Sequence, residues 1–540
     1  MKDVISMQDF SKQEILAILN AADEVKKAVH EPKSALVFRE KYQRDINTLL
    51  EGIKVACLFG EKSTRTNYSF RVAAGSAGAY VDGFSSKDDT SLAKGETWGE
   101  TFAMFGGWGY DAIIMRTTEE GLPKWIDEYL TNAHQQLKQQ HELIDLPLAY
   151  RKPLILNGGD GKNQHPTQCF LDLYTLRELA RAEGKELDGL ELALLNDLKY
   201  SRVIGSLMSV AHLFDWKLHL AHADRFGPQP HRLEELLRRG VSVTDYGPDF
   251  KQAMAGKFAA IQSRPQKERV GKGEDFAEIK KIGQITRELY DSLGEQAPYL
   301  LHPLPIDAEE FEEISAEMIF HPKNMMHLQA SNGIYVRKAL IALGVGRMKL
   351  GHSEPGLTEE RGTTIQDIPK SASPKEIDNP ASGFIRGNGI VLDHIPAGWG
   401  RRLEGILGLE GEGIFLVGSY NMPVAQGRKP CKDMLKIHQQ YNFSPEQLQA
   451  LAVVAPDITI TEVKNGEAVR KFRPQVGNYI NGRVKCGNDA CITNVKKEHI
   501  TTQHKIEEIN GERVLTCHYC EVTDTIPKIY QEQRFIYIGK

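Results

Sequence analysis

Ile53-Lys54-Val55-Ala56-Cys57-Leu58-Phe59 is a largely apolar run that Gly60 closes, and Ser63-Thr64-Arg65-Thr66 follows it closely. The run predicts a buried strand, and the apolar positions beyond it predict a helix over residues 64–77. A helix N-terminus presents unpaired N–H groups and the positive end of the helix dipole. The hydroxyl and guanidinium groups of Ser63–Thr66 add further donors, so this turn predicts a phosphate site. The alternative is an ordinary capped helix with a surface arginine.

Composition sets broad limits on the protein. A chain of 540 residues suggests about three or four domains. Charged residues make up 26% and the net charge is -5, so a polyanion-binding protein is not indicated. The sequence has no apolar stretch of about 20 residues that would span a bilayer. Residues 1–7 lack the apolar core of a signal peptide, which predicts a cytoplasmic location.

Apolar runs alternate with helical patterns through residue 345, which predicts two α/β domains with parallel sheets over residues 1–150 and 151–350. Ligands bind such sheets at the carboxyl ends of the strands. Polar residues follow several of the runs, which favours one shared site: Ser63–Thr66, Arg116, His165, Lys199, Arg202, Arg264 and His302-Pro303.

The composition changes at residues 351–384, which carry four prolines and few large apolar residues, and we interpret them as a linker. Strand signals return at Ile390–Leu392, Ile414–Val417 and Ile458–Ile460, with a helical stretch near 444–453. These features predict a smaller α+β domain over residues 385–477. Four of the seven cysteines lie in the last 55 residues, which indicates a further small domain over 478–540.

Short motifs combine along the first half in a specific order. They are Ser63-Thr64-Arg65-Thr66, Thr90–Thr97 with Ser91 and Lys94, Met115-Arg116-Thr117, His165-Pro166-Thr167-Gln168, Asp197–Arg202 with Lys199, Arg264-Pro265-Gln266 and His302-Pro303-Leu304-Pro305. Residues 1–350 thereby resemble the catalytic chain of aspartate carbamoyltransferase. The second half resembles the regulatory chain of the same enzyme, through Asp393–Ala397, Lys432–Ile437 and the four-cysteine tail. The chain therefore resembles a natural fusion of the two subunits.

The resemblance implies a reaction of pyrimidine biosynthesis in which the amine of L-aspartate attacks carbamoyl phosphate. It implies that Ser63–Thr66 hold the phosphate, and that Thr66, Arg116 and His165 donate to the carbonyl oxygen as it gains negative charge. Gln168 and the backbone carbonyls of Pro303 and Leu304 would orient the carbamoyl NH2. Neither a catalytic cofactor nor a covalent intermediate is expected.

The two carboxylates of aspartate need cationic partners, and Arg202, Arg264 and Gln266 match the family's positions for them. In the family, the loop that carries Ser91 and Lys94 reaches into the site of a neighbouring subunit. An oligomer with shared active sites is therefore expected.

Plainer interpretations stand beside these roles. His165 could simply end a strand, Arg202 and Arg264 could be surface charges, and Lys199 could be solvated. His302 is expected to be structural. Ornithine carbamoyltransferase shares the Ser-Thr-Arg-Thr motif but typically has cysteine at the position of Pro303.

The sequence departs from the family pattern at several places, of which two are the most visible. Ile306 stands where an arginine often follows the His-Pro-Leu-Pro motif, and the glutamine-rich stretch Thr131–Leu143 looks like an insertion. The sequence assigns neither of them a role.

The cysteine tail has the spacing of a metal site. Cys486-x4-Cys491 and Cys517-x2-Cys520 suit a closed tetrahedral zinc site, which predicts a structural metal. A four-cysteine ribbon near several lysines could instead be a nucleic-acid-binding scaffold with an inactive enzyme half. Because no stripe of aromatic and basic residues accompanies the cysteines, we do not expect nucleic-acid binding.

The resemblance also implies a nucleotide effector site in the 385–475 region, for which CTP and ATP are the candidate ligands. The matching positions are Asp393, His394, Lys432, Lys436 and Lys471. Lysines suit a triphosphate, although a solvated lysine face is the alternative.

Overall fold

The computed structural model describes residues 1–146, 148, 151–266, 280, 282–307, 309, 311–350, 363–368, 385–409, 413–422, 431–509 and 511–536. The chain divides into two compact units: Met1–Pro355 with Ala490–Ile492, and Gly356–Asp489 with Thr493–Lys540. Each unit is described by itself.

The first sheet of the first unit is parallel, with strand order β2-β1-β3-β4. Its strands are β1 (Lys54–Phe59), β2 (Tyr80–Asp82), β3 (Ala112–Thr117) and β4 (Leu154–Asp160). The strand order reverses beside β1, because the chain passes first to β2 on one side and then to β3 on the other. The carboxyl ends of β1 and β3 therefore form a topological switch point, where ligands bind.

The second sheet is also parallel, with strand order β7-β6-β5-β8-β9. Its strands are β5 (Glu191–Asn196), β6 (Lys217–Ala221), β7 (Ser242–Asp245), β8 (Ala259–Ser263) and β9 (Tyr299–Leu301). A switch point lies between β5 and β8. Arg202 follows β5 and Arg264 follows β8, so the topology brings two distant segments to one edge.

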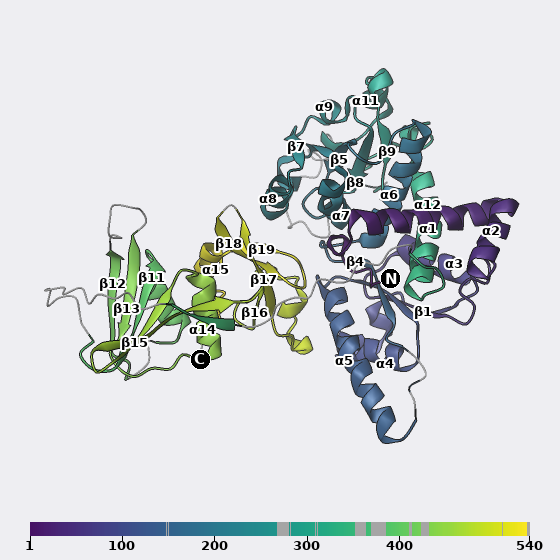
Figure 1. Ribbon diagram of the computed structural model, residues 1–540. Coiled ribbons are helices and arrows are strands. Elements are labelled where there is room, and N and C mark those ends of the chain that lie inside the picture. The colour runs from purple at the N-terminus through teal and green to yellow at the C-terminus, as the bar shows by residue number, and fades with distance from the viewer. Residues whose placement is uncertain are drawn as a thin grey trace. The chain divides into compact units, whose positions relative to one another are not determined.

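Helices surround these two sheets (Figure 1). They are α1 (Lys12–His30), α2 (Pro32–Tyr42), α3 (Thr64–Gly75), α4 (Trp98–Gly107), α5 (Leu122–Leu143), α6 (Pro166–Ala182), α7 (Arg202–Val210), α8 (Pro230–Arg238), α9 (Phe250–Met254), α11 (Arg287–Asp291) and α12 (Met326–Gly344). The last of these helices, α12, packs against α1, α3 and α6. One hydrophobic core connects these helices with buried residues of both sheets, and it includes Leu156, Leu192 and Leu340.

The second unit contains two antiparallel sheets. The larger has the order β10-β15-β14-β11-β13-β12, with β10 (Thr363–Asp367), β11 (Gly389–Pro396), β12 (Leu416–Met422), β13 (Lys432–Ile437), β14 (Thr459–Lys464) and β15 (Glu467–Val476). The smaller runs β16-β17-β18-β19, with β16 (Tyr479–Asn481), β17 (Gln503–Ile509), β18 (Glu512–Cys517) and β19 (Thr523–Thr525). The helices of this unit include α13 (Gly400–Ile406), α14 (Pro445–Val454) and α15 (Ile526–Gln531).

The predicted fold class is confirmed: two parallel-sheet α/β domains precede the antiparallel sheets of the second unit and a cysteine cluster. The stretch predicted as a linker includes strand β10, and the rest of it lies outside the described residues apart from Ile368. The predicted insertion Thr131–Leu143 forms the C-terminal part of α5. Among the described residues, none of the helices is long and apolar enough to cross a membrane.

Candidate active site

A cavity of about 470 Å³ lies at the carboxyl ends of the strands of both parallel sheets. Twelve of the fifteen residues predicted for catalysis and substrate binding line it: Ser63, Thr64, Arg65, Thr66, Arg116, His165, Gln168, Arg202, Arg264, Gln266, Pro303 and Leu304. These residues come from segments as far apart as 63 and 304, and the fold brings these distant segments together around one cavity.

The N-terminus of α3 forms one wall of the cavity. Ser63 is the N-cap residue, with extended backbone, and within the described part of the chain its side chain makes no capping hydrogen bond. The hydroxyl is therefore left for a ligand beside the helix N–H groups. Burial lowers the pKa of Arg65, and the nearby positive charge of Arg264 lowers it further. Two guanidinium groups that line one cavity and repel each other favour a bound anion there.

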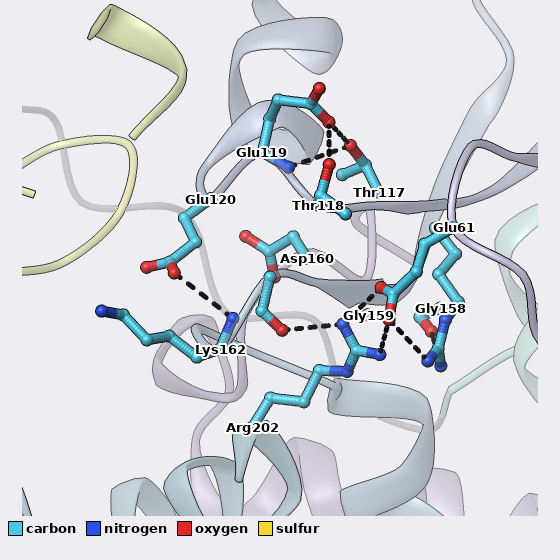
Figure 2. Close-up of polar contacts among 12 residues, drawn as sticks. Glu61, Thr117, Thr118, Glu119, Glu120, Gly158, Gly159, Asp160, Lys162 and Arg202 are labelled. Atoms are coloured by element: carbon cyan, nitrogen blue, oxygen red, sulfur yellow. Dashed lines mark hydrogen bonds and ion pairs between the residues drawn. The ribbon is translucent and has the colours of Figure 1, made fainter. Parts of the chain in front are cut away.

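Glu61, which the sequence analysis did not single out, connects the two α/β domains. Both terminal nitrogens of Arg202 donate to its carboxylate, at 2.8 and 3.0 Å, and Arg116 Nη2 donates to Glu61 Oε1 at 3.2 Å. Figure 2 shows the Arg202 guanidinium lying against the Glu61 carboxylate. Arg202 also donates to the carbonyl oxygen of Gly161 at 2.7 Å. Bidentate contacts of this kind fix a guanidinium in one orientation, so Arg202 is held at the cavity wall.

His165 lies just before α6 and is buried. Its backbone N–H donates to Ser206 Oγ at 2.9 Å, and Thr167 Oγ1 lies 3.5 Å from its Nδ1. Burial, and then the positive charges of Arg116, Arg202 and Arg337, hold the pKa of His165 well below its ordinary value. The imidazole is therefore neutral near pH 7, so it can donate an N–H without acting as a cation.

The turn after β9 is held by His302. The His302 imidazole accepts from Leu304 N–H at 2.8 Å through Nδ1, and its Nε2 lies 3.0 Å from Glu313 Oε1. Both ring nitrogens are therefore engaged by the protein. This geometry agrees with a structural role for His302 that shapes the backbone of Pro303 and Leu304.

Three predicted residues do not line this cavity within the described part of the chain. Ser91 and Lys94 lie in a short 3-10 helix, Ser91–Lys94, and both are exposed. Lys199 packs over the ring of Tyr200, 5.1 Å from its centroid, and lines a different hollow with residues 224–230. A role for Ser91 and Lys94 in a neighbouring subunit stays a prediction.

Several residues that the sequence analysis did not single out also line the cavity, among them Glu61, Lys62, Ser69, Gln329 and Arg337. Arg337 had a visible signal, because it is a charged residue inside the apolar stretch of α12. Its guanidinium donates to Ser69 Oγ at 2.6 Å, and burial lowers its pKa to about 10. Ile306, where the family often has arginine, packs against a hydrophobic core cluster of the second sheet.

The effector candidates gather on one face of the larger antiparallel sheet. Lys471 pairs with Thr461, Thr461 with Val391, and Val391 with Lys436. Residues directly opposite each other in a sheet share a face, so the two lysines flank Thr461 and Val391 on one surface.

Asp393 and His394 lie further along β11 on the same sheet. Asp393 Oδ1 forms an ion pair with Lys432 Nζ at 2.7 Å, and His394 Nδ1 is 3.3 Å from Asp393 Oδ2. Burial lowers the pKa of His394, and the charges of Lys432, Lys471 and Arg473 lower it further, whereas Asp393 raises it. All five predicted effector residues are thus close together in a positively charged region.

The four tail cysteines converge. Cys486, Cys491, Cys517 and Cys520 are buried, and their sulfur atoms all lie within 4.8 Å of one another. The sulfurs of Cys486 and Cys520 are 3.6 Å apart, far longer than the S–S bond of about 2.05 Å. Thiolates bound tetrahedrally at about 2.3 Å would lie about 3.8 Å apart, so the arrangement fits a structural metal.

Comparisons with known proteins agree with this geometry. Residues 2–178 match the aspartate/ornithine carbamoyltransferase carbamoyl-P binding domain, and residues 188–343 match the Asp/Orn binding domain of that family. Residues 385–475 match the allosteric domain of the aspartate carbamoyltransferase regulatory chain, and residues 478–529 match its metal binding domain.

Individual relatives cover the first half. The aspartate carbamoyltransferase catalytic subunit of Methanopyrus kandleri is 32% identical over 345 residues, which are 64% of this chain and 97% of that protein. The Chromobacterium violaceum subunit is 32% identical, with 63% of this chain and 97% of that protein covered. The solved catalytic subunit of M. jannaschii aspartate transcarbamoylase has a TM-score of 0.51 and 28% identity, covering 64% of this chain and 98% of that one.

The fold, the cavity and these matches define a carbamoyltransferase, and the chain belongs to the aspartate/ornithine carbamoyltransferase family. Within that family its relatives are aspartate carbamoyltransferases. The chain joins the catalytic domains of that enzyme to the two domains of its regulatory chain, as the motifs predicted.

Proposed function

We propose that the cavity transfers the carbamoyl group of carbamoyl phosphate to the amine of L-aspartate. The amine attacks the carbonyl carbon, a C–N bond forms, and the C–O bond to phosphate breaks. The amine loses one proton, which the departing phosphate can accept. The products are N-carbamoyl-L-aspartate and phosphate. The observation that carries the proposal is one cavity that combines a helix N-terminus, its Ser-Thr-Arg-Thr turn and the guanidinium groups of Arg116, Arg202 and Arg264.

The proposed roles follow from the position of each group. Ser63, Thr64 and Arg65 bind the phosphate at the N-terminus of α3. Thr66, Arg116 and neutral His165 donate to the carbonyl oxygen, where negative charge develops during attack. Gln168 and the carbonyls of Pro303 and Leu304 accept from the carbamoyl NH2.

The charges of the cavity favour aspartate as the acceptor of the carbamoyl group. Arg202 and Arg264, with Gln266, supply donors for the two carboxylates of aspartate. The side-chain cation of ornithine would meet Arg202 and Arg264 in place of a carboxylate, and this repulsion disfavours ornithine. The test is to incubate the protein with carbamoyl phosphate and aspartate and to measure both products. Equal amounts of N-carbamoyl-L-aspartate and phosphate are expected, whereas phosphate release without carbamoyl transfer would contradict the proposal.

Zinc is the metal that we propose for the four cysteines, because zinc favours closed tetrahedral thiolate sites. It would hold the C-terminal domain together and take no part in the transfer. We further propose that Lys432, Lys436 and Lys471, with Asp393 and His394, bind a nucleotide effector such as CTP or ATP. The converging positive charge supports a polyphosphate ligand. A cytoplasmic location stays a prediction.

We also propose that active sites are shared between copies of the chain, with Ser91 and Lys94 completing the site of a neighbour. The prediction concerns Lys94→Ala and Arg202→Ala. Each variant alone should be nearly inactive, because every site then lacks one group. Hybrids assembled from both should regain part of the wild-type activity, because some interfaces combine two intact contributions.

The measurement is specific activity after the two variants are dissociated, mixed and reassembled. Each variant taken through the same cycle alone is the control. Correctly assembled hybrids without recovered activity would mean that Lys94 acts within its own chain.

A further inference from the structure

Behind the cavity wall lies Asp172, a buried carboxyl group to which the proposed mechanism gives no role. It follows Gln168 by one helical turn on α6, and its exposed fraction is 0%. Its Oδ1 accepts from Gln168 Nε2 at 2.9 Å and from Gln329 Nε2 at 2.6 Å. Its Oδ2 is buried and has no hydrogen-bond partner among the residues that the structure describes. One oxygen atom therefore serves two amides from different helices.

This contact sets the orientation of both amides. An oxygen acceptor attracts the NH2 branch of a glutamine amide and repels the C=O branch, so each Nε2 must face Asp172. The Oε1 of Gln168, a residue that lines the cavity, is then on the other branch. Carbamoyl phosphate presents an NH2 group, which needs acceptors. Because Asp172 holds the Nε2 of Gln168, the Oε1 of Gln168 stays available to accept from the carbamoyl NH2.

The second amide, that of Gln329, leads to the turn after β9, which also lines the cavity. Gln329 Oε1 accepts from His302 N–H at 2.9 Å, and His302 Nδ1 accepts from Leu304 N–H at 2.8 Å. The connection thus runs from Gln168 through Asp172, Gln329 and His302 to Leu304. Its two ends are the side-chain acceptor and the backbone acceptors assigned to the carbamoyl NH2.

The groups around Asp172 affect the protonation of its carboxyl group but leave Oδ1 able to accept hydrogen bonds. The pKa of Asp172 is raised to about 7, because burial outweighs the opposing effects of the two amide hydrogen bonds and of the Arg337 charge on α12. Burial, and then the charge of Asp172, raise the pKa of the neighbouring Cys169 thiol. Oδ1 can accept both amides whether or not the buried Oδ2 carries a proton.

We propose that Asp172 is a positioning residue that makes the cavity select an NH2 group on the transferred carbonyl carbon. This inference rests on the proposed function, because it assumes that carbamoyl phosphate is the donor substrate. Asp172 does not touch the substrate. It acts through the amide of Gln168 and, by way of Gln329 and His302, through the turn at Leu304.

The test compares carbamoyl phosphate with acetyl phosphate, which has a methyl group in place of NH2 and needs no acceptor there. For each variant, the KM for carbamoyl phosphate and the inhibition constant of acetyl phosphate are measured. Asp172→Ala should weaken the binding of carbamoyl phosphate about ten- to hundredfold, since a buried donor that loses its acceptor costs about 1–3 kcal/mol. The inhibition constant of acetyl phosphate should change by less than about threefold, because its phosphate and carbonyl contacts remain.

Two further variants distinguish a positioning role of Asp172 from a general loss of structure in α6. Asp172→Asn keeps an acceptor oxygen and should retain most of the preference for carbamoyl phosphate. Thr175→Val is the matched control: Thr175 is equally buried on α6, and its Oγ1 accepts from Asn332 Nδ2 on α12 at 3.0 Å, away from the cavity lining. It should lower stability but leave the preference unchanged. If Asp172→Ala does not fold, Asp172→Ser, whose shorter side chain cannot reach both amides, replaces it.

The inference would be overturned if Asp172→Ala weakened the binding of carbamoyl phosphate and acetyl phosphate equally, or left the preference for carbamoyl phosphate unchanged. A double-mutant cycle adds a second criterion: in the Gln168→Ala background, removing the Asp172 carboxyl should reduce the preference far less than in the wild type. Additive effects would also overturn it. A wild-type protein that makes no N-carbamoyl-L-aspartate would instead contradict the proposed function.

Discussion

Replacing His165 with alanine should lower kcat by about 10²–10³-fold, the loss observed when one donor to a developing oxyanion is removed. The hydrogen bond from the imidazole strengthens as negative charge grows on the carbonyl oxygen, so the loss should appear in kcat more than in KM. Because burial and three arginines hold the pKa of His165 well below its ordinary value, the donor is already neutral near pH 7. Protonation of His165 should therefore not lower kcat as the pH falls from mildly alkaline values through about 6.5, where an ordinary histidine gains a proton.

His165→Asn is the matched control, because its amide keeps an N–H donor of smaller reach. It should be more active than His165→Ala. Steady-state kinetics with carbamoyl phosphate and aspartate measure both variants. A near-normal kcat in His165→Ala would show that His165 does not stabilise the developing oxyanion.

Metal removal should unfold the C-terminal cysteine domain while carbamoyl transfer continues. Structural zinc contributes about 10–16 kcal/mol to the folding of small domains, more than their limited apolar core can replace. None of the four cysteines lines the catalytic cavity, so transfer should persist. Any response of activity to CTP or ATP should be lost, because the effector sheet and the cysteine domain share a hydrophobic core.

A mercurial titration makes this test quantitative. Cys57 and Cys169 are fully buried and have raised thiol pKa values, which keeps them unreactive. Cys431 is only half-buried, so the titration is performed on Cys431→Ala. Four equivalents per chain should release one metal ion, with hydrogen exchange showing loss of protection from residue 478 onward. Loss of transfer activity together with the metal would contradict the separation of the two functions, and an activity indifferent to both nucleotides before removal would contradict the effector proposal.

Much of the fold could be predicted because its strands are buried apolar runs. Ile53–Phe59 predicted β1 to within one residue, and the turn that follows predicted the N-terminus of α3. The short strands β2 and β7 escaped prediction because their residues are largely exposed and carry no apolar run. Strand β10 escaped because its neighbours are rich in proline and polar residues.

The candidate site was predictable where residues sit directly in motifs and unpredictable where the partner is distant. Gln168 and Asp172 are one helical turn apart, which the sequence displays. Gln329, which shares the Asp172 oxygen, comes from 157 residues later and only the packing of α12 on α6 reveals it. Glu61 adjoins the Ser63–Thr66 motif, but its function as a partner of Arg116 and Arg202 depends on how the two sheets face each other.

If this chain carbamoylates aspartate, a comparison of two acceptors should show it. Initial rates of carbamoyl transfer from carbamoyl phosphate are measured over a range of L-aspartate and L-ornithine concentrations on the same protein sample. We expect kcat/KM for aspartate to exceed that for ornithine by at least about 10³-fold, because two carboxylates meet arginines where the ornithine cation would be repelled. A kcat/KM for ornithine equal to or greater than that for aspartate would contradict it.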